Sequence, residues 1–139
     1  DNSVMNGYSV AWASDVSDRG FSMKEGVAII PAMNWNEMTT EESAKALAGP
    51  QTEKVITQEL RQKEFDNYST TDDHGMHIVG IATDQSGNIF YKVKNSWGIT
   101  GKYDGFIYIS KAFVALRTTN LMVNRNAIPV AIAKKMGIM

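Results

Sequence analysis

His74 and Asn95 are the residues of this 139-residue chain whose side chains best suit proton-transfer chemistry. An asparagine oxygen can accept a hydrogen bond from one imidazole nitrogen, which fixes the tautomer and leaves the other nitrogen free to move a proton. Trp97, two residues beyond Asn95, can shield such a bond from water. The pair supplies two parts of a catalytic triad. The nucleophile must come from elsewhere, because the chain has no cysteine and nothing in its sequence singles out a serine.

A β-hairpin would bring His74 and Asn95 together although 21 positions separate them. We expect a strand at residues 76–82, a loop at 83–88 with Gly87 available for a positive φ, and a partner strand at 89–94. In a hairpin, the start of the first strand and the end of the second are neighbours. The two side chains are therefore predicted to lie side by side.

The rest of the chain predicts short helices and strands around this hairpin. Together they indicate an α+β fold, with surface helices around an antiparallel set of about five strands, in a single domain of residues 1–139. The other predicted strands lie at 8–13, 27–32 (an edge strand or extended loop, because of Pro31), 105–110 and 121–123. The predicted helices run from Thr39 or Thr40 to Ala48 before Gly49, over 50–65, over 111–116 behind a Ser110 cap, and from Pro129 until Gly137 interrupts the tail.

Composition excludes several classes of protein. Hydrophobic residues make up 43% of the chain and charged residues 21%, which is unlike a disordered or collagen-like sequence. The formal net charge is -1, so no basic excess points to nucleic acid or to an anionic membrane surface. The apolar runs are too short to span a bilayer, and the absence of cysteine excludes disulfides and thiolate metal sites.

His77 raises the possibility of a histidine metal site shared with His74. On a strand, an offset of three places the two side chains on opposite faces, whereas a helix would place them on one face. Gly75 and the following Ile-Val-Gly-Ile favour a strand. We therefore expect no metal and no other cofactor. An ordinary hydrogen-bonded role is the simplest alternative for either histidine.

Three strings of residues resemble the papain-like cysteine peptidases. They are Asp73-His74-Gly75-Met76, the run Val-Lys-Asn-Ser-Trp-Gly at 93–98, and Gly-Phe-Ile-Tyr-Ile at 105–109. The strand around residues 7–12 is similar to the one that precedes the histidine region in the same family. The long insert before His74 and the sequence from 110 to 129 look more like the bleomycin hydrolase and aminopeptidase C branch. The resemblance covers about residues 7–128.

The resemblance implies a role for each matched residue. His74 corresponds to the catalytic general base and acid, Asn95 to the residue that orients it, and Trp97 to the aromatic that covers their hydrogen bond. His77 matches no catalytic position, and Asp73 belongs to the motif without an assigned catalytic role. The nucleophilic cysteine of the simplest family members lies about 130–150 residues before the histidine, whereas only 73 residues precede His74.

That spacing leads us to expect the C-terminal, antiparallel β-rich half of a papain-like cysteine aminopeptidase, without its helical, cysteine-bearing half. A start at Asp1, with no initiator methionine or signal-like segment, fits the same expectation. Alone, such a chain should lack peptidase activity and should expose an apolar face meant for the missing half.

The branch implies a peptide substrate, the missing N-terminal half as partner, homo-oligomerisation as a hexamer and a cytoplasmic location. In that branch the C-terminal tail lies in the active-site cleft. For the tail of this chain two alternatives stay open: it enters the cleft in the same way, or it forms a frayed helix on the surface. A different class of function also stays open, in which the chain is a non-catalytic half-domain that acts as a binding or regulatory module.

Overall fold

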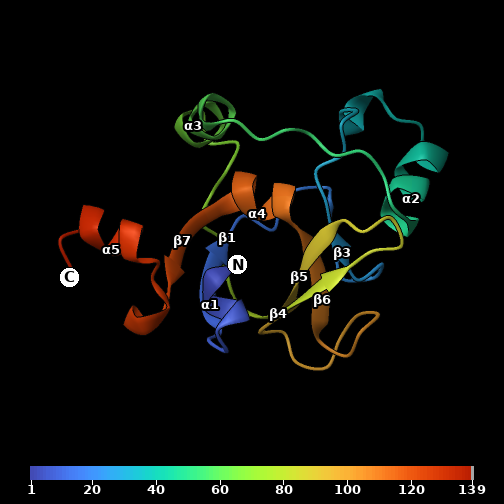
Figure 1. Ribbon diagram of the computed structural model, residues 1–139. Coiled ribbons are helices and arrows are strands. Elements are labelled where there is room, and N and C mark those ends of the chain that lie inside the picture. Colours follow the sequence, from blue (N-terminus) through green and yellow to red (C-terminus); the bar gives the residue numbers. More distant parts are fainter. Residues whose placement is uncertain (139) are drawn as a thin grey trace.

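A seven-stranded sheet forms the centre of the protein in a computed structural model that describes residues 1–138. The strands follow the order β2-β3-β6-β5-β4-β1-β7, and the helices lie around the curled sheet (Figure 1). The strands are β1 (Val10–Ser14), β2 (Phe21–Ser22), β3 (Val27–Ala28), β4 (His74–Thr83), β5 (Ile89–Lys94), β6 (Phe106–Ser110) and β7 (Thr118–Met122). The helices are α1 (Asn2–Met5), α2 (Thr40–Ala48), α3 (Gln58–Asp66), α4 (Lys111–Arg117) and α5 (Val130–Lys135), with 3-10 turns at Trp35–Glu37 and Arg125–Ala127.

The β4–β5 hairpin is closed by a turn whose residues suit its geometry. Gly87 has a φ of 83°, and the Asp84 carboxylate accepts hydrogen bonds from the backbone N–H groups of Ser86 and Asn88, each at 2.8 Å. The register runs from Thr83 opposite Ile89 to His77 opposite Lys94, with one irregularity between Ile78 and Gly80. This register carries the end of β5 alongside the start of β4.

The core lies on one face of the central strands, under α4. Side chains in β1, β4 and β6 alternate between buried and more exposed positions, as expected for strands with one covered face. Phe113 and Leu116 of α4 pack against the same cluster. The buried cluster contains Val10, Trp12, Ala28, Ile30, Met76, Ile78, Val93, Ile107, Ile109, Phe113 and Leu116.

The α+β fold class is confirmed, and the strand count is larger than expected. Five of the six pairings between neighbouring strands are antiparallel, but β3 runs parallel to β6, with Val27 opposite Tyr108. The two-residue strand β2 carries too short a pattern to be found from sequence, and of the edge strand or extended loop predicted at 27–32 only Val27–Ala28, as β3, is strand. Four predicted strands are shifted: β1 runs from Val10 to Ser14, β4 is longer at both ends, β6 starts at Phe106, and β7 begins at Thr118.

The predicted helix at 50–65 is wrong in its first half. The backbone N–H of Lys54 donates to the Ile30 carbonyl at 3.0 Å, and Pro31 pairs with Glu53 in an isolated bridge. These contacts hold the segment before Thr57 in an extended form. The helix α3 starts only at Gln58, where the Thr57 hydroxyl accepts from Leu60 N–H and caps the first turn.

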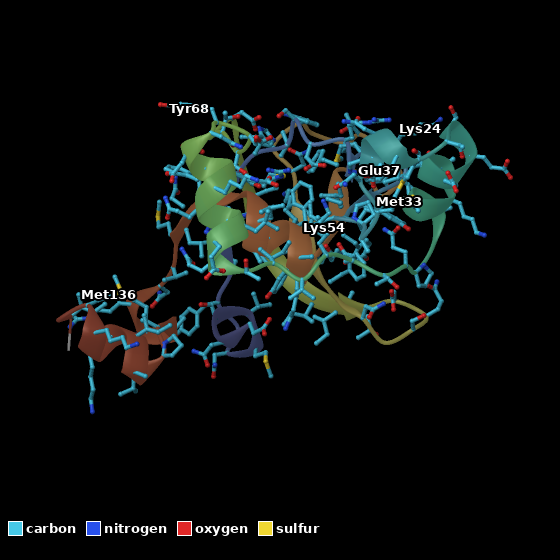
Figure 2. All side chains as sticks on the ribbon, turned by 90° about the horizontal axis from the view of Figure 1, so that it is seen from above. Lys24, Met33, Glu37, Lys54, Tyr68 and Met136 are labelled. Carbon is cyan, nitrogen blue, oxygen red and sulfur yellow. The ribbon has the colours of Figure 1, made fainter. Side chains whose placement is uncertain are left out.

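The predicted helix caps and the predicted tail helix are present in the structure. Thr39 caps α2 in a capping box with Glu42, and the Ser110 hydroxyl accepts from Phe113 N–H at the start of α4. The predicted tail helix is α5, and the chain after it includes Gly137 at a φ of 65°. Met136 lies at the end of α5, apart from the body of the molecule (Figure 2). Met139, the last residue of the predicted tail, lies outside the described residues.

Among the helices of residues 1–138, none combines the length and the apolar character needed to cross a membrane.

Candidate active site

The structure brings His74 and Asn95 together as the hairpin predicts. His74 is the first residue of β4, and Asn95 directly follows the last residue of β5. Their side chains meet at 2.7 Å between His74 Nε2 and Asn95 Oδ1. This distance is at the short end for an N–H···O hydrogen bond, so the contact is well formed.

The Asn95 amide is fixed by contacts on both of its ends. Its Oδ1 also accepts from the Ser96 backbone N–H at 2.7 Å, and its Nδ2 lies 3.3 Å from Met23 Sδ. The side chain is buried, at 4% exposure, and its backbone N–H donates to the Gly105 carbonyl at 2.9 Å. Because an amide oxygen can only accept, the network assigns the proton of the neutral imidazole to Nε2.

The Nδ1 atom of His74 is the nitrogen left for chemistry. Within residues 1–138, none of the hydrogen bonds involves this atom. The Ser96 hydroxyl lies 3.4 Å from Nε2 and contacts the Gly75 carbonyl at 3.3 Å, so it sits on the Asn95 side of the ring. Nδ1 is therefore available to exchange a proton with a group that lies outside the described residues.

Trp97 covers one face of the imidazole. The two ring centroids are 4.6 Å apart with a tilt of 34°, close enough to shield the His74–Asn95 bond. Trp97 is itself 50% exposed, and Phe21 of β2 supports it edge-on at 6.1 Å. Neither Phe21 nor Met23 was identified from sequence. Both lie more than 50 positions before His74, in a segment with no motif to single them out.

His77 is separated from this site by the alternation of β4. It lies on the outward face, opposite Ala11, and its Nε2 is 3.0 Å from the Ser9 hydroxyl. In the part of the chain that the structure describes, no three His, Cys, Asp or Glu side chains gather closely enough to hold a metal. Among the hydrogen bonds of residues 1–138, none joins Asp73 to the His74 ring. Asp73 Oδ1 accepts from Val16 N–H at 2.9 Å and so holds the backbone before the histidine.

A shallow groove on β1 and the start of β4 reaches the site at Asn95, and His77 lines it whereas His74 does not. Its floor is made of small residues, including Ala11, Ala13 and Gly75, and its edges include Ser96 and Met122. A different hollow, of about 430 Å³, lies between the end of α2 and the β4–β5 turn, and neither His74 nor Asn95 lines it. Of these two hollows, only the groove touches the proton-transfer pair, and it does so through Asn95.

The sheet holds a histidine–asparagine pair under a tryptophan, which is the arrangement that the resemblance to papain-like cysteine peptidases led us to expect. Residues 6–137 match the Peptidase C1-like family, and the chain belongs to that family. The recognition from motifs is therefore confirmed at the level of the family.

Solved and curated proteins agree with this assignment. PepW from Lactobacillus rhamnosis has the same fold over 96% of this chain, with a TM-score of 0.61 and 19% identity. Cathepsin L1 of Drosophila melanogaster is 54% identical over 35 residues, and cathepsin L of Sarcophaga peregrina is 46% identical over 39 residues. These two matches cover 25% and 28% of this chain. The chain spans 27% of the PepW structure, and the matches span 9% and 12% of the two cathepsins.

Proposed function

We propose that this chain is the C-terminal, His/Asn-bearing part of a cysteine aminopeptidase of the bleomycin hydrolase type, with His74 and Asn95 as two members of its Cys-His-Asn triad. The observation that carries the proposal is the 2.7 Å contact between His74 Nε2 and Asn95 Oδ1, which leaves Nδ1 free. Trp97 supports the role by covering that contact.

The nucleophile is a cysteine of a segment outside this chain, because none of the 139 residues is cysteine. In the resting enzyme the cysteine is a thiolate, and His74, which faces it, is an imidazolium with a proton on Nδ1. The thiolate attacks the peptide carbonyl carbon, and the carbonyl π-electrons move to oxygen to give a tetrahedral anion. Collapse of that anion breaks the C–N bond, and His74 gives its Nδ1 proton to the leaving amine.

The acyl-enzyme is then hydrolysed by the same imidazole. Neutral His74 takes a proton from water at Nδ1 while the water oxygen attacks the thioester carbonyl. The second tetrahedral anion expels the thiolate, which releases the carboxylic acid and restores the ion pair. Throughout the cycle, Asn95 accepts from Nε2–H and keeps Nδ1 directed at the reacting atoms.

The finer parts of the proposal come from the resemblance. They are a preference for the N-terminal residue of a peptide, assembly into a homohexamer with the helical half of each subunit in place, and a cytoplasmic location. The exposed side chains of Trp97 and Ile99, at 50% and 85%, are consistent with a surface that another segment covers.

The first test is the intact mass and thiol titration of the protein isolated from its source. A mass well above 15.4 kDa with one reactive thiol, together with hydrolysis of aminoacyl-coumarin amides that His74→Ala abolishes, is the expected result. The 139-residue chain alone should hydrolyse none of these amides. A natural protein of 15.4 kDa without a thiol would overturn the proposal and favour a binding or regulatory half-domain.

A further inference from the structure

The segment from Ser69 to Asp73 joins α3 to His74, and each of its residues is held from outside the segment. Tyr68, just before it, projects outward beyond α3 (Figure 2). Arg117 Nη1 donates to the Ser69 carbonyl (3.0 Å) and to the Thr70 hydroxyl (2.6 Å). The Thr71 N–H donates to Asp15 Oδ2 (2.9 Å). The Thr119 hydroxyl donates to Asp72 Oδ1 (2.8 Å), and the Val16 N–H donates to Asp73 Oδ1 (2.9 Å).

Asp15 is a buried carboxylate that makes one of these contacts, to Thr71. It is 2% exposed and follows directly on Ser14, the β1 residue that lies opposite His74. Its Oδ1 accepts from the N–H and hydroxyl of Ser17, and its Oδ2 accepts from the N–H and hydroxyl of Thr71. Burial acts to raise the pKa of Asp15, but the Ser17 and Thr71 hydrogen bonds and the Arg117 charge lower it below its ordinary value.

Arg117 is a half-buried cation beside Asp15. Its side chain is 12% exposed and forms ion pairs with Asp18 and Glu64, each at 2.6 Å. Its backbone carbonyl accepts from Asp15 N–H at 3.0 Å. Arg117 thus bonds to the residue after β1, to the C-terminal part of α3 and to the start of the 69–73 segment. Buried charges with several partners are costly to disrupt, because removal of one partner leaves the others uncompensated.

The position of His74 makes these contacts relevant to the site. The histidine is the first residue of β4, so the ladder with β1 fixes its backbone on one side only. On the other side, its backbone is fixed by the 69–73 segment. Asp15 and Arg117 bond to residues 69–71 of this segment, and Thr119 and the Val16 backbone hold Asp72 and Asp73.

We propose that Asp15 and Arg117 are positioning residues for His74: through their hydrogen bonds to residues 69–71, they fix the backbone that directs the imidazole Nε2–H to Asn95. The inference rests on the proposed function and adds two residues that the sequence motifs do not contain.

The test measures the exchange of the His74 Nε2 proton with water by NMR, in the ¹⁵N-labelled full chain at pH 7.5. Asp15→Asn retains the shape of the side chain and removes its charge and one acceptor. The double variant Thr70→Val/Thr71→Val removes the hydroxyl contacts to Arg117 and Asp15 and leaves both charged residues in place. If Asp15→Asn does not fold, the exchange rate in this double variant tests the inference. Asp84→Asn is the matched control, since Asp84 also accepts several turn hydrogen bonds but lies in the remote β4–β5 turn.

We expect the His74 proton to exchange at least threefold faster in a folded variant of the segment and to be unchanged in Asp84→Asn. A smaller increase in the folded variants would overturn the inference and leave the cluster with a stabilising role alone. If the wild-type chain itself lacks a protected Nε2 proton, the His74–Asn95 pair is absent in solution and the proposed function fails instead.

Discussion

Replacement of Asn95 by alanine removes the acceptor on which the candidate site depends. In the wild-type chain, Asn95 Oδ1 accepts two hydrogen bonds of 2.7 Å, from His74 Nε2 and from the Ser96 backbone N–H. Alanine retains the backbone bond to Gly105 but leaves both donors without this acceptor. The change therefore probes the side chain and spares the strand.

The size of the effect follows from the two lost bonds. A buried or half-buried hydrogen bond contributes about 1 kcal/mol net, so the pair is worth about 2 kcal/mol. Ser96 is exposed, and water can replace the bond to its N–H, which keeps the loss near this value. For a chain of this length, about 3–4 °C is lost per kcal/mol, which predicts a fall in Tm of about 7 °C.

The assay is thermal unfolding followed by circular dichroism, with Asn88→Ala as control. Asn88 donates from Nδ2 to Asp84 Oδ2 at 2.8 Å in an exposed turn, so its loss should cost roughly 0.5 kcal/mol or less. The His74 Nε2 proton should also lose its protection from exchange in Asn95→Ala and retain it in the control. A fall in Tm no larger than that of Asn88→Ala would refute the account of Asn95 as a structural anchor for the histidine.

Three further changes test other parts of the structure. Trp97→Ala should speed exchange of the His74 Nε2 proton several-fold with little change in Tm, because the ring covers the bond while half of it faces solvent; an unchanged exchange rate would contradict the shielding role. Phe113→Ala should lower the free energy of unfolding by roughly 3–5 kcal/mol in urea titration, since the ring is fully buried. Burial raises the pKa of Glu53, with hydrogen bonds from Ser110 and Ile30 only partly offsetting it, so the carboxylate should lower stability as pH rises above the usual glutamate range. Glu53→Gln should remove that decline and unfold at a higher temperature than wild type at pH 7.5; a lower Tm would show that the charge is needed.

The candidate site was predictable because its signals are local. A turn with Gly87 and two alternating strands are enough to place His74 beside Asn95, and hydroxyl caps at Thr39 and Ser110 are read from a few residues. Each of these features depends on contacts within about twenty positions, so the pattern and the structure agree.

Features set by distant parts of the chain were not predictable. The segment before α3 reads as helix, but its Lys54 N–H donates to the Ile30 carbonyl across the whole of α2, and its Glu53 carboxylate accepts from the Ser110 hydroxyl 57 positions away. Phe21 and Met23 reach the site in the same way, through the parallel pairing of β3 with β6. Their residue types suit many positions, so only the tertiary fold assigns them to this one.

The place of β1 between β4 and β7 has a consequence for how the protein is made. Ser14 pairs with His74 on one side and with Thr118 on the other, so strands from the beginning, middle and end of the chain must all be present to complete this part of the sheet. Such distant pairings are slow to form, because long loops must close first. During synthesis on a ribosome, the His74 end of β4 can gain its full support only after residues 118–122 have emerged. Until then the nascent chain exposes an unpaired strand edge, which is a target for chaperones and for misassembly.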